Sequence, residues 1–322
     1  MAEAQRPSGT ATLAQLLAGM ALFGTSTPLS KIVGESFSVF TGSFFRMAIA
    51  TLVLLPFVLW KTDRFAKIER SDFTVVAAIA AVGMVGFTAA MLFGMRMTTG
   101  VIGSTVMSST PAITALGAVI FFGAAMNRRK AGAIALAVAG IALINIFRGG
   151  DGGGDARLLG AALILLAVLF EAAYTLLSRK LSDGISSIEA SFAASLLAGL
   201  LFAVLSFAFD PRPFGIGEAD TRSLAALLFW GAATGGLAPV LWYTGARKAP
   251  GALTARAMAV MPLSALSLSY VLLGEAFEWI HLAGFGLVFA GLILMIFEHA
   301  SSGKSQKDAK DGEIEAHEHR RC

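Results

Sequence analysis

Long apolar stretches separated by short polar connections run along almost the whole chain. Ten of these stretches are long enough to cross a bilayer as an α-helix, which takes about 20 residues. They cover residues 11–33, 38–60, 72–95, 98–122, 130–147, 158–177, 187–209, 223–246, 250–273 and 279–297. The pattern predicts an all-α integral membrane protein with ten transmembrane helices.

Composition agrees with a chain that lies mostly in lipid. Of its 322 residues 56% are hydrophobic and 14% are charged, whereas soluble domains carry about 25% charged residues. The basic residues fall in short connections, which sets membrane orientation and does not make a nucleic-acid surface. We therefore expect the lipid bilayer as a partner and no nucleic acid. The single cysteine, Cys322, excludes an intrachain disulfide.

Lysine and arginine are unequally divided between the two sides of the predicted bundle. With the N-terminus inside, the inner connections hold eleven of them and the outer connections five. This bias predicts that both termini are cytoplasmic. The first ten residues have too little positive charge, and the next apolar stretch is too long, for a cleavable signal peptide.

The second half of the chain repeats the first. A shift of 151 positions aligns seven residue pairs without a gap. The pairs are Gly94/Gly245, Arg96/Arg247, Gly100/Gly251, Met107/Met258, Pro111/Pro262, Gly123/Gly274 and Gly140/Gly291. Each repeat holds an odd number of spans, so the second copy enters the membrane in the opposite direction. Inverted repeats are typical of secondary transporters, with the substrate site between the halves near the midplane. Shared Gly and Pro composition is the alternative explanation.

The repeat predicts a domain organisation of five parts. They are an N-terminal cytoplasmic segment 1–10, a first five-helix repeat 11–147, a Gly-rich linker 148–157, a second five-helix repeat 158–298 and a polar cytoplasmic tail 299–322. The linker sequence GGDGGGD at 149–155 has neither the strand before it nor the Lys-Ser/Thr after it that a phosphate-binding loop requires.

Polar, aromatic and methionine side chains recur at spacings of three and four residues, which places them on single helix faces. We expect these faces to line a central cavity and to bind a small-molecule substrate. The residues are Thr27, Met84, Phe87, Thr88, Met107, Ser108, Glu171, Tyr174, Thr175, Trp242 and Met258. Ordinary packing and interhelical hydrogen bonds are the alternative for each. Pro28, Pro111, Pro239 and Pro262 lie inside spans and predict kinks that free backbone carbonyls.

Glu171 lies inside the sixth span, where a charge costs roughly 2.5–3.5 kcal/mol on insertion scales. At a helical rise of about 1.5 Å per residue, Glu171 and Arg256 both lie roughly 10 Å from the inner surface. We therefore expect the two to form an ion pair. Glu171 then has three possible roles: it binds the ammonium group of a substrate, it carries a proton, or it serves only as a structural salt bridge.

Several segments resemble the EamA family of the drug/metabolite transporter superfamily. The resemblance covers about residues 12–298 and is carried by ALFGTSTPLSKIV, by Arg46 in FFRMAIATLVLLP, by AAYTLLSRKL and by the paired proline helices. It implies two inverted five-helix repeats around a cavity lined by helices one, three, four, six, eight and nine. It also implies export of amino acids, including aromatic ones, and related metabolites across a bacterial inner membrane. In one departure, Ala124 follows Gly123 where the family often has an acid, as Glu275 follows Gly274.

Other classes of function fit the sequence less well. An intramembrane enzyme would need paired acids, a Ser–His arrangement or a metal cluster, but the four histidines lie at a helix end or in the tail. We therefore expect no enzymatic activity, no cofactor and no metal. A nucleotide-sugar carrier would need more basic residues in the cavity. A broad-specificity exporter of drugs or lipophilic cations stays open as an alternative, because Met-rich and aromatic pockets also suit such molecules.

Overall fold

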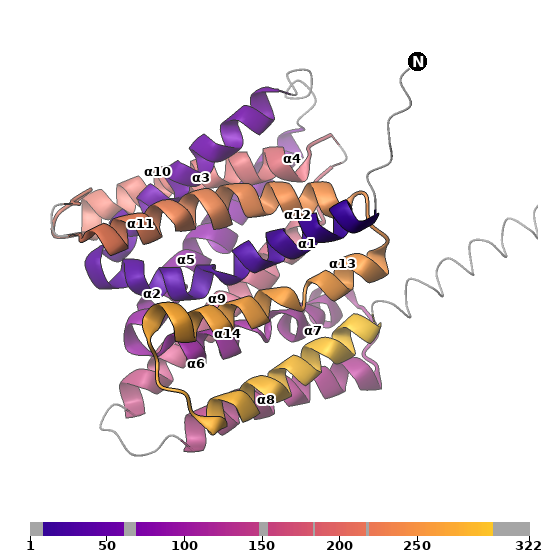
Figure 1. Ribbon diagram of the computed structural model, residues 1–322. Coiled ribbons are helices and arrows are strands. Elements are labelled where there is room, and N and C mark those ends of the chain that lie inside the picture. Colours follow the sequence, from indigo (N-terminus) through magenta and orange to yellow (C-terminus); the bar gives the residue numbers. More distant parts are fainter. Residues whose placement is uncertain (1–8, 61–68, 148–153, 183, 217–218, 299–322) are drawn as a thin grey trace, which may run out of the picture.

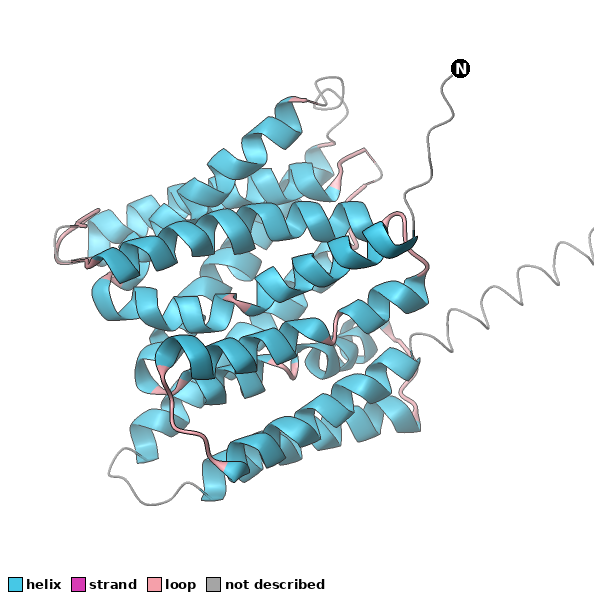
Figure 2. Ribbon diagram, viewed as in Figure 1, coloured by secondary structure: helices cyan, strands magenta, loops and turns pink. Residues whose placement is uncertain are grey.

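The computed structural model describes residues 9–60, 69–147, 154–182, 184–216 and 219–298, and these residues form helices joined by short loops (Figures 1 and 2). Nine helices in these ranges are long and apolar enough to cross a membrane. They are Thr10–Ser36, Val39–Leu59, Arg70–Met97, Gly100–Phe121, Asp155–Ser178, Ser187–Phe209, Thr221–Ala246, Leu253–Leu273 and Trp279–Glu298. The helix at the remaining predicted position, α8 (Arg128–Phe147), has 20 residues and begins with three cations. The predicted all-α membrane fold is confirmed.

Three of the spans are broken near a proline. The first divides into α1 (Gly9–Gly24) and α2 (Ser26–Ser36), the fourth into α6 (Gly100–Met107) and α7 (Thr110–Phe122), and the ninth into α13 (Gly251–Ala257) and α14 (Val260–Leu273). Pro28, Pro111 and Pro262 each lie within the first three residues after the break. Proline lacks an N–H group and clashes with the carbonyl four residues earlier, which explains the position of each break.

The third and eighth spans each contain a π-helical segment. The third consists of α4 (Arg70–Ala78), η2 (Ile79–Gly86) and α5 (Phe87–Met97), and the eighth of α11 (Thr221–Phe229), η3 (Trp230–Leu237) and α12 (Ala238–Ala246). The bounds of η2 and η3 differ by 151 residues, the same shift that aligns the sequence repeats. The repeat is therefore present in the backbone as well as in the sequence. Pro239 stands in the first turn of α12, directly after η3.

Small residues allow the helices to approach closely. A Cβ atom on Gly94 of α5 would lie 2.8 Å from the carbonyl oxygen of Gly160 on α9 (Gly154–Ser178). A Cβ atom on Gly284 of the last helix would likewise lie 2.8 Å from the carbonyl oxygen of Gly140 on α8. Because apolar side chains gain nothing by leaving lipid, such close backbone contacts are a main source of helix association in membranes.

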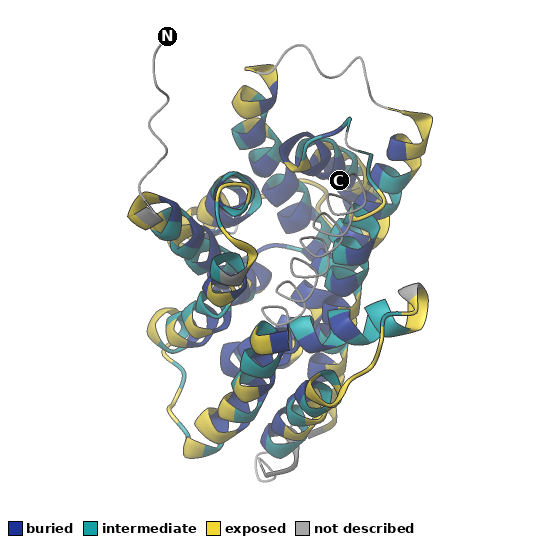
Figure 3. Ribbon diagram, turned by 90° about the vertical axis from the view of Figure 1, so that its right-hand side faces the viewer, coloured by how far each residue is buried: buried dark blue, intermediate teal, exposed yellow. Residues whose placement is uncertain are grey.

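The outside of the bundle is apolar. Viewed along the helices, buried residues lie on the inner faces and exposed residues on the outer faces (Figure 3). Phe121, Phe207 and Val271 are 76%, 76% and 75% exposed. In a bilayer these side chains contact lipid tails, so their exposure is consistent with the membrane environment that the composition predicts.

Candidate functional site

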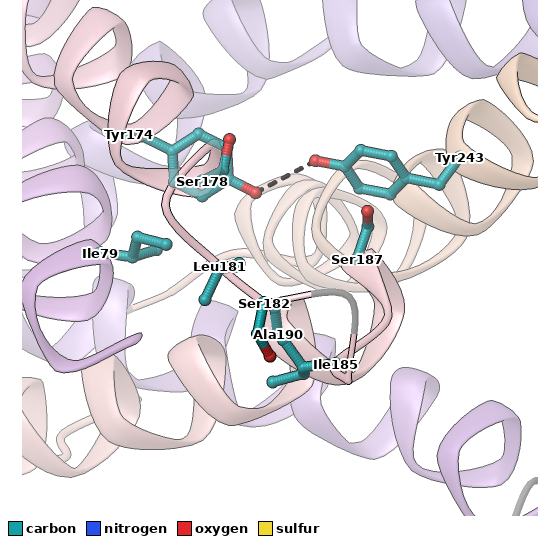
Figure 4. Close-up of a pocket in the computed structure, with 9 residues that line it drawn as sticks. All are labelled: Ile79, Tyr174, Ser178, Leu181, Ser182, Ile185, Ser187, Ala190 and Tyr243. Atoms are coloured by element: carbon teal, nitrogen blue, oxygen red, sulfur yellow. Dashed lines mark hydrogen bonds between the residues drawn. The ribbon is translucent and has the colours of Figure 1, made fainter. Parts of the chain in front are cut away.

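A pocket of about 200 Å³ lies at one end of the bundle, between the third, sixth, seventh and eighth spans. It is lined by Ile79 of η2, Tyr174 and Ser178 of α9, Leu181, Ser182 and Ile185 of the following connection, Ser187 and Ala190 of α10 (Ser187–Phe209), and Tyr243 of α12 (Figure 4). The first turns of α1 lie at the same end, because Gln15 donates a hydrogen bond to Thr244 next to Tyr243. Loop charge predicts that this end faces the cytoplasm.

Two tyrosines face each other across the pocket. The hydroxyl oxygens of Tyr174 and Tyr243 are 3.2 Å apart, and either can donate the hydrogen bond (Figure 4). Tyr174 packs closely against η2, since a Cβ atom on Gly83 would lie 2.7 Å from the Tyr174 Cβ. Ring faces next to polar hydroxyls suit a small molecule that is partly apolar and partly polar.

The connection between α9 and α10, which lines the pocket, is hydrogen-bonded to the third span. Asp72 in the first turn of α4 accepts hydrogen bonds from the Ser182 N–H group at 2.9 Å and from the Ser182 hydroxyl at 2.7 Å. The next helix, α10, begins with a capping box in which Ser186 and Glu189 satisfy each other's backbone N–H groups. These contacts fix the beginning of the seventh span, and with it Ser187, against the pocket.

Glu171 lies one turn before Tyr174 in α9, and its carboxylate contacts a neighbouring helix. Thr110 Oγ1 of α7 is 2.8 Å from Glu171 Oε2 and 2.7 Å from the carbonyl oxygen of Met107. That carbonyl is the one that Pro111, four residues later, cannot satisfy. One hydroxyl hydrogen serves one of the two acceptors at a time. When Thr110 donates to Met107, a hydrogen bond between Thr110 and Glu171 requires a proton on the carboxyl group.

The predicted ion pair between Glu171 and Arg256 is not formed in this conformation. Arg256, near the end of α13, is exposed, and the described residues contain no ion pair between the two. The sequence matched their depths along the helix axis, but depth does not determine the direction in which a side chain points. The break between α13 and α14 further shifts the helical phase on which such an estimate depends.

Most other predicted cavity residues are packed between helices in this conformation. Thr88 is fully buried and accepts a hydrogen bond from Arg46, and Ser108 donates to the carbonyl of Ser104 on its own helix. Met84, Phe87 and Met107 pack against apolar side chains, and Thr27 is buried. The Thr175 hydroxyl donates a hydrogen bond to the Glu171 carbonyl. Met258 is exposed and Trp242 is half-buried. Their predicted contact with substrate stays a prediction.

The sequence missed the contribution of the seventh span. Ser187 and Ala190 line the pocket, although the resemblance implied a cavity formed by helices one, three, four, six, eight and nine. The run of small polar residues at the beginning of this span was the available signal, but serine there is also typical of a helix cap. In the ranges that the structure describes, no three His, Cys, Asp or Glu side chains gather to hold a metal ion.

At the opposite end of the bundle, charged side chains form hydrogen bonds with main-chain groups of neighbouring spans. Lys31 donates hydrogen bonds to the carbonyls of Met95 and Thr98, and Arg96 donates to those of Gly34 and Phe37. Glu275, after α14, accepts from the N–H groups of Gly100 and Val101 at the beginning of α6. These hydrogen bonds connect the first, third, fourth and ninth spans at this end.

Two structurally related sets of broken spans in a lipid-exposed bundle, with a small-molecule pocket at one end, define a polytopic membrane transporter. The chain belongs to the EamA-like transporter family, whose sequence profile matches residues 10–146 and 158–297. The family resemblance predicted from the sequence is thus confirmed.

Three related proteins are similar over most of the chain. An uncharacterized transporter of Bacillus subtilis (strain 168), YetK, is 31% identical over 91% of this chain and 88% of its own length. A chloroplastic WAT1-related protein of Arabidopsis thaliana is 24% identical over 88% of this chain and 68% of its own. An uncharacterized transporter of Archaeoglobus fulgidus is 23% identical over 85% and 93%.

A solved structure has the same fold. It superposes with a TM-score of 0.63 at 15% identity and covers 91% of this chain and 99% of its own. At this identity the likeness concerns the fold alone. Together the comparisons place the chain among multi-pass membrane transporters for small molecules.

Proposed function

We propose that this chain exports amino acids, with aromatic amino acids as the first candidates, from a bacterial cytoplasm across the inner membrane, with both termini in the cytoplasm. One observation carries the proposal: the Tyr174–Tyr243 pair lines a pocket, and Glu171 lies one turn deeper on the same helix. Tyrosine faces suit an aromatic or apolar side chain, and a carboxylate suits an ammonium group.

The transport cycle that we propose is alternating access between the two repeats, 11–147 and 158–298. Substrate enters at the Tyr174–Tyr243 pocket, moves past Glu171, and leaves when the repeats rock and the opposite end opens. The predicted residues that are now packed, such as Met107 and Thr88, would face the cavity in other states of this cycle. Support comes from the 151-residue repeat of π-helical segments, because equivalent spans can exchange roles at the two ends.

Proton exchange is a part of the proposal that Glu171 supports. Its carboxyl group shares the Thr110 hydroxyl with the Met107 carbonyl, so its protonated form keeps a hydrogen bond that its ionised form loses when Thr110 turns. Proton binding at Glu171 would therefore alternate with binding of the substrate's ammonium group.

A broad exporter of drugs or lipophilic cations is the second candidate. It is favoured by the absence of an ion-pair partner for Glu171 among the described residues, since a bound cation would supply one. The two candidates differ in whether the transported molecule needs a carboxylate.

The test uses the purified full chain in proteoliposomes. Uptake and efflux of radiolabelled phenylalanine, tryptophan, threonine and a lipophilic cation are measured with and without a pH gradient. Wild type is compared with Glu171→Gln and with the control Glu35→Gln, which removes an exposed carboxylate at the opposite end. We expect amino-acid transport that responds to the gradient in wild type and in the control but not in Glu171→Gln.

Two outcomes contradict parts of the proposal. Amino-acid transport that ignores the gradient in all three proteins would make the chain a facilitator and Glu171 a structural residue. Transport of the cation alone would replace amino-acid export by the second candidate.

A further inference from the structure

Arg46 is buried inside the membrane region at a junction of four spans. It lies seven residues into α3 (Val39–Leu59), about 10 Å from the end of the helix at 1.5 Å per residue, and is 9% exposed. Its Nη1 atom donates to Thr88 Oγ1 at 2.9 Å, and its guanidinium carbon lies 4.3 Å from the centroid of the Trp230 ring. Trp230 in turn donates from Nε1 to Ser26 Oγ at 2.7 Å. We call these four residues the Arg46 cluster.

The guanidinium of Arg46 lacks an anionic partner. Its Nε atom is buried without a hydrogen bond, and no carboxylate in the described part of the chain lies within ion-pair distance. Lys31 and Arg96 differ, because backbone carbonyls of neighbouring spans accept their hydrogen bonds. An unpaired buried charge is strongly unfavourable in a protein interior or in lipid, and such charges in transporters mark the substrate path.

The repeat relates the Arg46 cluster to the pocket. Trp230 is the first residue of η3, and its equivalent at a shift of 151 is Ile79, the first residue of η2, which lines the pocket. Ile79 belongs to an apolar cluster that includes Ala190 and Ala194 of the seventh span, whereas Arg46 of the second span lies over the Trp230 ring. The neighbouring span therefore contacts this position through a charged side chain at the far end and through apolar side chains at the pocket end.

We propose that Arg46 binds the carboxylate of the transported molecule once the far end opens. The guanidinium offers two parallel N–H donors to a carboxylate, and Nε is one of the donors now without a partner. In the conformation described here, the Trp230 ring and Thr88 contact the guanidinium. The inference rests on the proposed function and deepens it: the substrates are carboxylates whose ammonium group binds near Glu171, and amines without a carboxylate are disfavoured.

The test compares indoles that differ in one group. Counterflow of tryptophan, tryptamine, which lacks the carboxylate, and indole-3-propionate, which lacks the ammonium group, is measured in proteoliposomes of the full chain. The proteins are wild type, Arg46→Lys, Arg46→Gln and the control Arg96→Gln, which removes an exposed cation that donates to main-chain carbonyls. The readout is the ratio of tryptophan to tryptamine transport, because a residue with a purely structural role changes stability but not this ratio.

We expect wild type and Arg96→Gln to prefer tryptophan about tenfold or more, as a charge-assisted hydrogen bond supports. Arg46→Gln should transport both indoles equally, and Arg46→Lys should lie between, which also keeps the test valid if the glutamine variant folds poorly. An unchanged ratio in both Arg46 variants, with tryptophan still transported, would overturn the inference and leave amino-acid export intact. Failure of wild type to transport tryptophan would overturn both proposals.

Discussion

Glu275 connects the two repeats at the end away from the pocket, and its removal should loosen that end. The residue follows Gly274, which has a φ of 63° and ends α14 in the left-handed conformation. Its Oε2 atom accepts from the Val101 N–H group at 2.8 Å, and its Oε1 atom accepts from the Gly100 N–H group. The carboxylate thus satisfies two of the four free N–H groups at the beginning of α6 and lies at the positive end of that helix dipole.

The expected loss for Glu275→Ala is about 2 kcal/mol. Loss of a helix cap costs about 0.5–2 kcal/mol, and hydrogen bonds to a charged group are worth about 1.5–3 kcal/mol when buried. Glu275 is only partly buried, so the lower part of the second range applies. At about 2–4 °C per kcal/mol, the melting temperature should fall by about 4–8 °C. Glu275→Gln keeps an acceptor oxygen and loses the charge, so about half of that fall is expected.

The assay is thermal unfolding of the purified chain in detergent at one scan rate, because unfolding of membrane proteins in detergent is commonly irreversible. Glu35→Gln is the matched control. Glu35 is exposed at the same end and interacts electrostatically with Lys31, as Glu275 does, but it caps no helix. Equal shifts for Glu275→Ala and Glu35→Gln, or a shift below about 1 °C for the former, would show that the cap does not stabilise this end.

Two further predictions concern packing and pH. Gly83→Ala places a Cβ atom 2.7 Å from the Tyr174 Cβ and should cost about 1–3 kcal/mol in thermal unfolding while displacing the tyrosine pair, whereas Gly286→Ala, with nothing within 4 Å, is the neutral control; equal melting temperatures would contradict this packing. Asp220, just before α11, accepts hydrogen bonds from the Ser223 side chain and N–H group, which hold its pKa below the usual value. Because the folded-state pKa is lowered, the ionised carboxylate stabilises the protein above the unfolded pKa, and this stabilisation is lost as the pH falls below about 4. Asp220→Asn should therefore lower the melting temperature at pH 7 more than at pH 3. An equal decrease at the two pH values would refute this prediction.

The sequence predicted the spans well because hydrophobic length is a local property. The described helices begin and end within a few residues of the predicted spans, and the breaks before Pro28, Pro111 and Pro262 follow from the missing N–H group of proline. The two π-helical segments could not be predicted, since no residue type marks them. Their equivalence, in contrast, follows from the 151-residue shift that the sequence already contains.

The site was predicted less completely, since it depends on how helices rotate and pack. The face of the sixth span placed Tyr174 in the pocket, because spacing along one helix is independent of its neighbours. Tyr243 and Ser187 reach the same pocket from other spans, and only tertiary packing brings these three together. The unformed Glu171–Arg256 pair has the same cause, because it required knowledge of two helix orientations.

Differences between the repeats explain why the two ends of the bundle are not equivalent. Two identical inverted copies would make the two ends equivalent, and neither would be favoured. Glu275 caps α6, but its equivalent at a shift of 151 is Ala124, which has no carboxylate to cap α13. Arg46 lies over Trp230, whereas the residues clustered with Ile79 are apolar. The Glu275 cap stabilises the end away from the pocket, and Arg46 places a buried charge there that a carboxylate would neutralise. The difference between the two ends therefore follows from where the copies have diverged.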